Sequence, residues 1–176
     1  MRKSGLFALL LLASCSDGGD GGAADKQKAA EASRKLQLSP GQWETTAEVT
    51  KLTKQDGAPK AAIDTPVGTK STVSACVGEA EAKRPPAVLL AGSDAYQCEY
   101  GDMYMSAGTL NAALTCTRKG LKGDVRMSLD GSYTGDTLEA NQSLSTFLPG
   151  DGDANIVSRL TARRTGECTA AAGKAA

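Results

Sequence analysis

Polar and apolar residues alternate along much of the chain beyond residue 38, beginning around Trp43. The even positions from 42 to 48 are polar, and the odd positions carry Trp43, Thr45, Ala47 and Val49. Successive side chains of a β-strand point to opposite faces, so this period of two predicts a half-buried strand with Trp43 on its inner face.

Further segments with strand character follow at 71–77, on both sides of Gly108, at 124–133, after Asp136 and at 156–165. Residues 55–68 are rich in Gly, Pro, Ala and Asp and predict a long loop. A short helical stretch is expected over 79–83, and the proline pair at 85–86 ends it. Taken together, the segments predict a mainly β fold: an antiparallel meander of about seven strands, strongly curved or partly closed into a barrel, with one short helix.

Turn signals fix the register of two hairpins. A three-residue loop 106–108, with Gly108 in a positive-φ conformation, places Tyr104 opposite Leu110, Tyr100 opposite Leu114 and Cys98 opposite Cys116. Met103 then faces Asn111 on the other side of the ribbon. A two-residue turn at 135–136 likewise pairs Tyr133 with Leu138, Gly131 with Ala140 and Met127 with Leu144. Since a slip of one residue would move every side chain to the wrong face, coherent apolar faces support both registers.

The N-terminus has the pattern of an export signal, which determines the compartment in which the cysteines are expected. Arg2 and Lys3 precede a short apolar run, 6–12, which ends in the lipobox Leu12-Ala13-Ser14-Cys15. The run is shorter than the ~20 residues of a membrane span. We therefore expect a lipoprotein signal peptide over 1–14, lipidation of Cys15, and a flexible tether over 15–37 that joins the lipid to a β domain over 38–169. Residues 170–176 should be a disordered tail.

Four cysteines remain in an oxidising compartment, and four cysteines allow three pairings. The hairpin register brings Cys98 and Cys116 together, which leaves Cys76 to pair with Cys168. Two disulfides would brace the core of a chain that has only seven aromatic residues in all, a Trp, two Phe and four Tyr. Zinc is the rival interpretation, but the chain has no Cys-x-x-Cys pair and no His, so we expect no metal and no cofactor.

The net charge of the chain limits the partners that can be expected. Removal of the signal peptide leaves 18 basic residues against 20 acidic ones, which gives no reason to expect nucleic acid. The expected partner is the membrane, through the lipid on Cys15. Because Ser16, and not Asp, follows that cysteine, we expect the periplasmic face of the outer membrane.

Candidate chemistry is sparse. Without His, the Ser-His-Asp and Cys-His schemes are excluded. Glu44 and Glu48 lie on the polar face of a strand, and the predicted role is solvated surface. Residues 151–155 imitate the start of a calcium loop, but Ile156 stands where that loop needs Gly, so a hairpin turn is the better interpretation.

Two further groups are ambiguous. Arginines near the chain end could bind an anion, although charges on strands usually mark a solvated face: these are Arg159, Arg163 and Arg164. A period of two places three tyrosines on one face of a strand and two methionines on the other: these are Tyr96, Tyr100 and Tyr104 with Met103 and Met105. Such a pattern indicates core residues. If the curved sheet leaves a gap, the same side chains could line a site for an apolar molecule.

The landmarks resemble one family. They are Pro40-Gly41-Gln42-Trp43-Glu44, Cys76 followed by Glu79-Ala80, the Cys98 and Cys116 pair, Gly131-Ser132-Tyr133-Thr134-Gly135-Asp136, and Arg163-Arg164-x-Gly166-x-Cys168. In this order, over about residues 38–169, they resemble the small envelope proteins catalogued as domain of unknown function 3617. The resemblance implies a periplasmic, cysteine-paired β domain and carries no activity or catalytic residues.

Function is accordingly expected to be non-catalytic: an envelope lipoprotein that serves as a binding or interaction module. The alternatives are a carrier of an apolar ligand such as a lipid, and an enzyme. A deep polar pocket would favour the enzyme, an enclosed apolar cavity the carrier, and a flat or convex surface a protein partner.

Overall fold

The computed structural model describes residues 37–55, 57, 59–150 and 152–168. The expected signal peptide, Cys15, nearly all of the tether and the tail lie outside the described residues. The elements are β1 (Gly41–Lys54), β2 (Lys70–Val77), the 3-10 turn η1 (Glu79–Glu81), α2 (Ala87–Ala91), β3 (Tyr96–Ser106), β4 (Thr109–Arg118), β5 (Asp124–Tyr133), β6 (Thr137–Phe147) and β7 (Ala154–Gly166).

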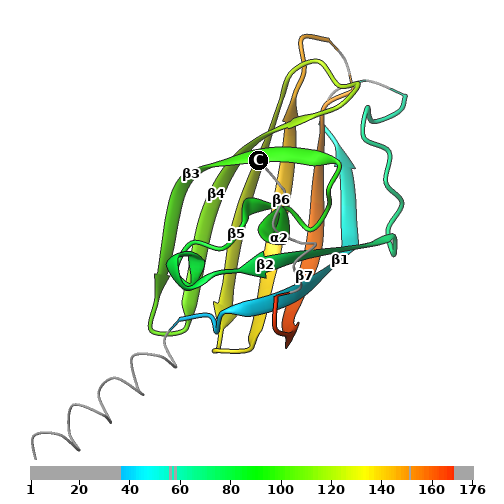
Figure 1. The fold of residues 1–176 in the computed structure, drawn as a ribbon. Coiled ribbons are helices and arrows are strands. Elements are labelled where there is room, and N and C mark those ends of the chain that lie inside the picture. Colours follow the sequence, from blue (N-terminus) through cyan, green and yellow to red (C-terminus); the bar gives the residue numbers. More distant parts are fainter. Residues whose placement is uncertain (1–36, 56, 58, 151, 169–176) are drawn as a thin grey trace, which may run out of the picture.

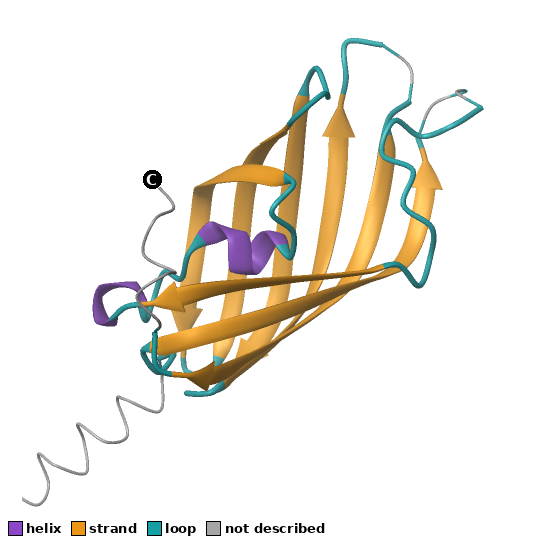
Figure 2. Ribbon diagram, turned by 45° about the vertical axis from the view of Figure 1, so that its right-hand side comes forward, coloured by secondary structure: helices purple, strands orange, loops and turns teal. Residues whose placement is uncertain are grey.

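The seven strands form one antiparallel sheet in the order β2-β1-β7-β6-β5-β4-β3. Figures 1 and 2 show this sheet curled into a half-barrel, with β2 and β3 as its two free edges. The helix α2 lies on the concave side and contacts β1, β2 and β3. The expected fold class is confirmed: a strongly curved antiparallel sheet with one short α-helix and two disulfides.

The core fills the concave side, as the alternation predicted. Along β1, the odd positions from Trp43 to Val49 are buried and the even positions are only partly so. Trp43 is 1% exposed, and its indole N–H donates a hydrogen bond to the Ser39 carbonyl at 2.9 Å. A buried indole N–H needs a hydrogen-bond acceptor. Trp43 in β1 therefore positions the segment that precedes the strand.

The hairpin of β5 and β6 has the predicted register throughout. Tyr133 lies opposite Leu138, Gly131 opposite Ala140, and Met127 opposite Leu144, with no shift along the ladder. Each of these strands has a neighbour on both sides, so a change of register would disturb two ladders.

The hairpin of β3 and β4 follows its predicted register only in the half remote from the turn. Cys98 lies opposite Cys116 and Tyr100 opposite Leu114, but the register then shifts, and Tyr104 faces Asn111 instead of Leu110. The turn is Ala107-Gly108, with φ of 50° and 80°, a two-residue type that takes two positive φ values. The prediction of a three-residue loop was therefore wrong.

A β-bulge at 101–102 accommodates the residue that the shorter turn leaves over. It exchanges the two faces of β3 beyond Tyr100. Met103 and Met105, expected opposite the tyrosine face, pack against the core, whereas Tyr104 is 57% exposed. Met103 accordingly faces Ala112 and not Asn111.

The prediction of the short helix was also wrong in place. Residues 79–81 form only a 3-10 turn, and the α-helix begins after the prolines that were expected to end one. Pro86 is the N-cap of α2, and Gly92 ends it with φ 67°. Proline at the start and glycine past the end are typical helix boundaries. A Cβ at Gly92 would lie 2.6 Å from that of Ala47, so this end of the helix packs directly against β1.

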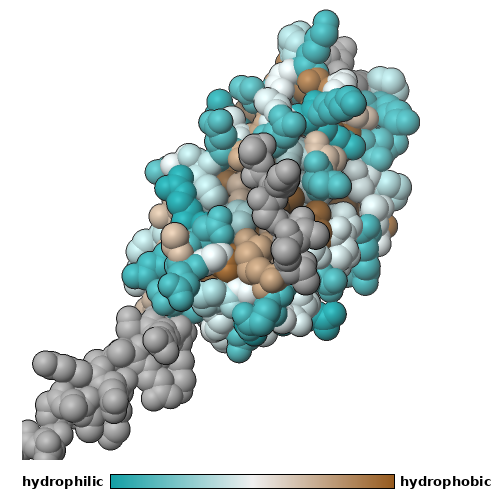
Figure 3. Space-filling view, viewed as in Figure 1, coloured by the Kyte–Doolittle hydropathy of each residue, from teal (hydrophilic) through white to brown (hydrophobic). Residues whose placement is uncertain are grey.

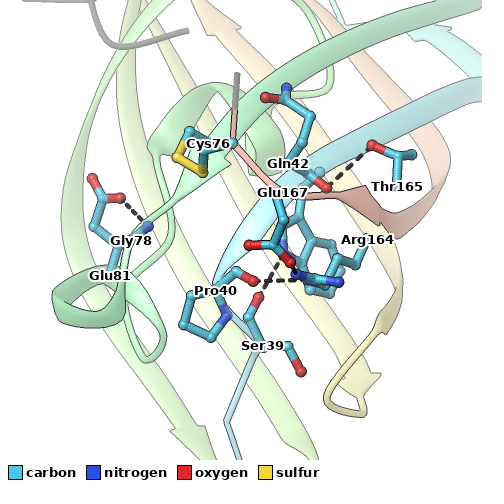
Figure 4. Close-up of a disulfide and its surroundings, with 11 residues drawn as sticks. Ser39, Pro40, Gln42, Cys76, Gly78, Glu81, Arg164, Thr165 and Glu167 are labelled. Atoms are coloured by element: carbon cyan, nitrogen blue, oxygen red, sulfur yellow. Dashed lines mark hydrogen bonds and ion pairs between the residues drawn. A yellow bond between two sulfur atoms is a disulfide. The ribbon is translucent and has the colours of Figure 1, made fainter. Parts of the chain in front are cut away.

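Both predicted disulfides are present. Cys98 and Cys116 cross-link β3 to β4, and Cys76 and Cys168 join the end of β2 to the segment after β7. Figure 4 shows the surroundings of Cys76, where the Arg164 side chain lies between the Pro40 carbonyl, to which its Nε donates, and Glu167. The C-terminal end of the domain is thus joined covalently to β2 and by a hydrogen bond to the segment before β1.

Candidate ligand-binding site

A cavity of about 200 Å³ opens on the concave side of the sheet, at the C-terminal end of α2. Figure 3 shows this side of the molecule, where apolar residues reach the surface among hydrophilic ones. The cavity walls come mainly from β1, β7 and β6, from the segment after α2 and from the loop before β2, with one residue each from β2, α2, β3 and β4. Its lining residues are Ala47, Val49, Thr65, Thr69, Ser71, Ala91, Ser93, Ala95, Tyr96, Arg118, Gln142, Leu144, Ile156 and Ser158.

Two polar side chains hold α2 beside this cavity. Gln142, on the inner face of β6 and 4% exposed, donates from Nε2 to the carbonyls of Leu90 and Ala91 at 2.7 and 3.1 Å. Ser71 on β2 donates from Oγ to the carbonyl of Gly92 at 2.6 Å. The last carbonyls of a helix have no partner within it, so these bonds satisfy them. The helix is therefore tied both to the middle of the sheet and to its β2 edge.

Arg118 and Tyr96 form a pair at the ends of β4 and β3. They lie opposite one another in the ladder, and the guanidinium carbon of Arg118 stands 5.4 Å from the centroid of the Tyr96 ring. Arg118 Nη1 also donates to the Tyr96 hydroxyl at 3.5 Å. Burial raises the pKa of Tyr96 above its usual range, and the nearby Arg118 charge opposes this rise.

The acidic candidates lie away from the cavity. Glu44 pairs with Arg163 at 3.2 Å, and Glu48 pairs with Lys70 at 3.2 Å. The predicted surface role of both carboxylates fits these exposed ion pairs, which contribute little to stability.

The arginines near the chain end are similarly engaged. Arg159 pairs with Glu139 at 3.5 Å and Arg163 with Glu44, while Arg164 contacts Pro40 and Glu167. None of the three lines the cavity. The structure therefore does not bring them together with the site.

The calcium-like segment forms part of the turn between β6 and β7. Asp151 lies outside the described residues. The Asp153 carboxylate accepts hydrogen bonds from Thr146 Oγ1 at 2.9 Å and from the Leu148 N–H at 3.0 Å, so it braces the turn. Within the described part of the chain, no three His, Cys, Asp or Glu side chains are grouped so as to hold a metal ion.

The tyrosine stripe is divided by the bulge. Tyr96 reaches the cavity, and Tyr100 packs against the core and donates its hydroxyl to the Pro85 carbonyl at 2.6 Å, with Arg84 over its ring at 4.8 Å. Tyr104 instead borders a shallow hollow of about 440 Å³ on the outer face of β3–β5. Only the first two tyrosines therefore belong to the concave side.

Sequence reasoning did not single out Arg118 or Gln142. Arg118 follows four apolar residues at the inward positions of β4, and Gln142 stands between Ala140 and Leu144 on the inward face of β6. A polar residue in an apolar series is a usable signal of a buried polar role. That signal was present in the sequence for both residues.

No helix in the described part of the chain is long and apolar enough to cross a membrane. No curated protein and no solved structure matches the chain. One family does match, over residues 38–168, which covers every strand and all four paired cysteines. The chain therefore belongs to the family described as protein of unknown function DUF3617.

Proposed function

We propose that this protein is a non-catalytic binding module of the cell envelope, anchored by lipid on Cys15 at the periplasmic face of the outer membrane. Its ligand is a small, largely apolar molecule that occupies the concave cavity. The observation that carries this proposal is the cavity itself, a recess of about 200 Å³ whose lining is neutral except for Arg118. Eight of its fourteen lining residues carry polar side chains and six are aliphatic, so the recess offers hydrogen-bonding groups beside an apolar wall. Ligand sites combine groups of these two kinds.

The composition of the lining argues against catalysis. The lining residues include no carboxylate, no thiol and no imidazole, the groups that usually transfer protons or attack a substrate. Tyr96 could donate or accept a proton only through its hydroxyl, and burial raises its pKa further from neutrality. An enzyme is therefore the weaker candidate.

The cavity also favours a small ligand over a protein partner as the occupant of the concave side. Its volume of about 200 Å³ suits a small molecule and is too small to receive a folded protein surface. This favours the apolar-ligand alternative considered from the sequence.

A cavity-filling substitution tests ligand binding. Ser158 is buried and lines the cavity, so Ser158→Leu should occupy the space that a ligand needs. Ser128 lies exposed on the outer face of β5 and provides the matched control, Ser128→Leu. We expect 1-octanol to raise the melting temperature of the wild type and of the control but not of Ser158→Leu, because a ligand that binds the native state stabilises it. An equal rise in all three proteins would contradict binding in the cavity.

Anchoring has its own test. Cells fed an alkynyl fatty acid should label the wild-type protein, and Cys15→Ala should take up no label, because the cysteine sulfur carries the diacylglycerol. Ser16→Ala is the control and should stay labelled. A labelled Cys15→Ala protein would contradict the proposed anchor.

A further inference from the structure

Among the described residues, Arg118 is the only one with a charged side chain that lines the concave cavity. Within the part of the chain that the structure describes, it makes no ion pair with a carboxylate. The arginines of β7 differ, because Arg159 and Arg163 each have a glutamate partner. The contacts of the Arg118 guanidinium with described side chains are those with the Tyr96 ring face and hydroxyl.

Stacking on a ring leaves most of an arginine's hydrogen-bonding capacity unused. A guanidinium has five N–H donors at its edges, and a ring contact occupies its face. The contact with the Tyr96 hydroxyl, at 3.5 Å, uses one donor weakly. The remaining edge suits a planar anion that accepts two parallel hydrogen bonds, as a carboxylate does.

Part of the remaining lining offers an apolar surface to a molecule that binds beside Arg118. Of the polar lining side chains, Ser71 and Gln142 already donate to the end of α2. The others, apart from Arg118, are Thr65, Thr69, Ser93, Tyr96 and Ser158. The aliphatic lining side chains are Ala47, Val49, Ala91, Ala95, Leu144 and Ile156. The cavity therefore combines one cationic edge with an aliphatic patch and several hydroxyl groups.

The volume limits the apolar part of the ligand. An engineered protein cavity of roughly 150 Å³ accommodates benzene. About 200 Å³ thus holds one ring or one short chain, and it does not hold the two long chains of a phospholipid.

We infer that the cavity binds a carboxylate with a single short apolar tail, its headgroup on Arg118 and its tail toward Leu144 and Ile156. This inference rests on the proposed function, since it names the ligand class of the same cavity.

Calorimetry with octanoate and 1-octanol tests the inference on the chain from residue 16 onward, exported without the lipid. A charge-assisted bidentate contact should make octanoate bind about tenfold or more tightly than the alcohol. Arg118→Gln should abolish this preference and leave octanol binding unchanged. Arg126 also stacks on an aromatic ring, that of Phe147 at 4.7 Å, but does not line the cavity. Arg126→Gln is therefore the matched control and should keep the preference.

The outcomes separate this inference from the proposed function. Equal binding of the two probes, or a preference retained in Arg118→Gln, would overturn the carboxylate assignment while the cavity remained a binding site. Displacement of octanoate by phosphatidylglycerol vesicles would overturn the single-tail assignment. If neither probe bound, and Ser158→Leu behaved as wild type, both the inference and the proposed function would be wrong.

Discussion

The hairpins β3–β4 and β5–β6 were predicted by the same rule, and the rule held completely in only one of them. Both have two-residue turns, and both place an apolar face on the core. β5 and β6 lie inside the sheet, where a register error would disturb two neighbours. β3 is an edge strand, so it can bulge at 101–102 without disturbing a second ladder. Turn geometry therefore fixes register reliably where both sides of the strand are paired, and less so at an edge.

Deleting one residue from each hairpin should give the largest difference in stability between the two. Deleting Asp102 removes the surplus residue of the bulge and leaves Met103 opposite Ala112, so every face is kept. We expect a cost of about 1 kcal/mol or less. Deleting Ser128 moves one half of β5 to the wrong face, and we expect no folded protein. Urea denaturation followed by circular dichroism measures both. A folded Ser128 deletion would contradict the account of the central hairpin.

Removing the disulfides tests how far the stability of the edge strand β3 depends on its cross-link. The chain-entropy model gives ~4.5 kcal/mol for the Cys76–Cys168 bond, which closes 92 residues, and ~3 kcal/mol for Cys98–Cys116, which closes 18. Alanine pairs at these positions should therefore lower the free energy of unfolding in that order. Hydrogen exchange should accelerate in β3 without Cys98–Cys116 while β5 and β6 stay protected. Faster exchange in β5–β6 instead would show that the central hairpin relies on the same bond.

Two glycines offer a smaller, matched comparison. A Cβ on Gly131 in β5 would lie 2.7 Å from Ala140 Cα and closer still to the Glu139 carbonyl, whereas a Cβ on Gly101 would meet nothing nearer than 3.6 Å. Gly131→Ala should therefore cost about 2 kcal/mol, because backbone atoms must move, and Gly101→Ala less than about 1 kcal/mol. Thermal denaturation of the two variants gives the comparison. Equal costs would mean that β6 can shift away from β5.

The smallest expected effect is the loss of stability at alkaline pH, which tests the burial of Tyr100 in the edge hairpin. Burial raises the pKa of Tyr100, with Arg84 opposing and Glu81 adding to the rise. Above pH ~10 the unfolded chain releases this proton while the native state keeps it, so stability is full below that pH and falls as the pH rises. Tyr100→Phe should flatten this fall. It should also lose about 1 kcal/mol at neutral pH with the hydrogen bond to Pro85. An unchanged alkaline slope, measured by urea denaturation, would contradict burial of the hydroxyl.

Strand positions, faces and cysteine pairing were accessible from the sequence. Alternation around Trp43 determined which face of β1 is buried, because side-chain direction in a strand is a local property. The pairing of Cys98 with Cys116 followed from the far half of a hairpin, where the predicted register is correct. With that pair assigned, the bond between Cys76 and Cys168 needed no further information.

The remaining features were decided by tertiary structure. α2 has only five residues, too few to form a stable helix alone, so it exists because the concave side of the sheet packs against it and Gln142 holds its end. The curl of the sheet creates the cavity and brings Arg118 to it from a strand end remote in sequence from most of the lining. Local pattern thus determined the strands and, except in β3 beyond Tyr100, their faces. The long-range packing energy of the closed core decided the bulge, the helix and the candidate site.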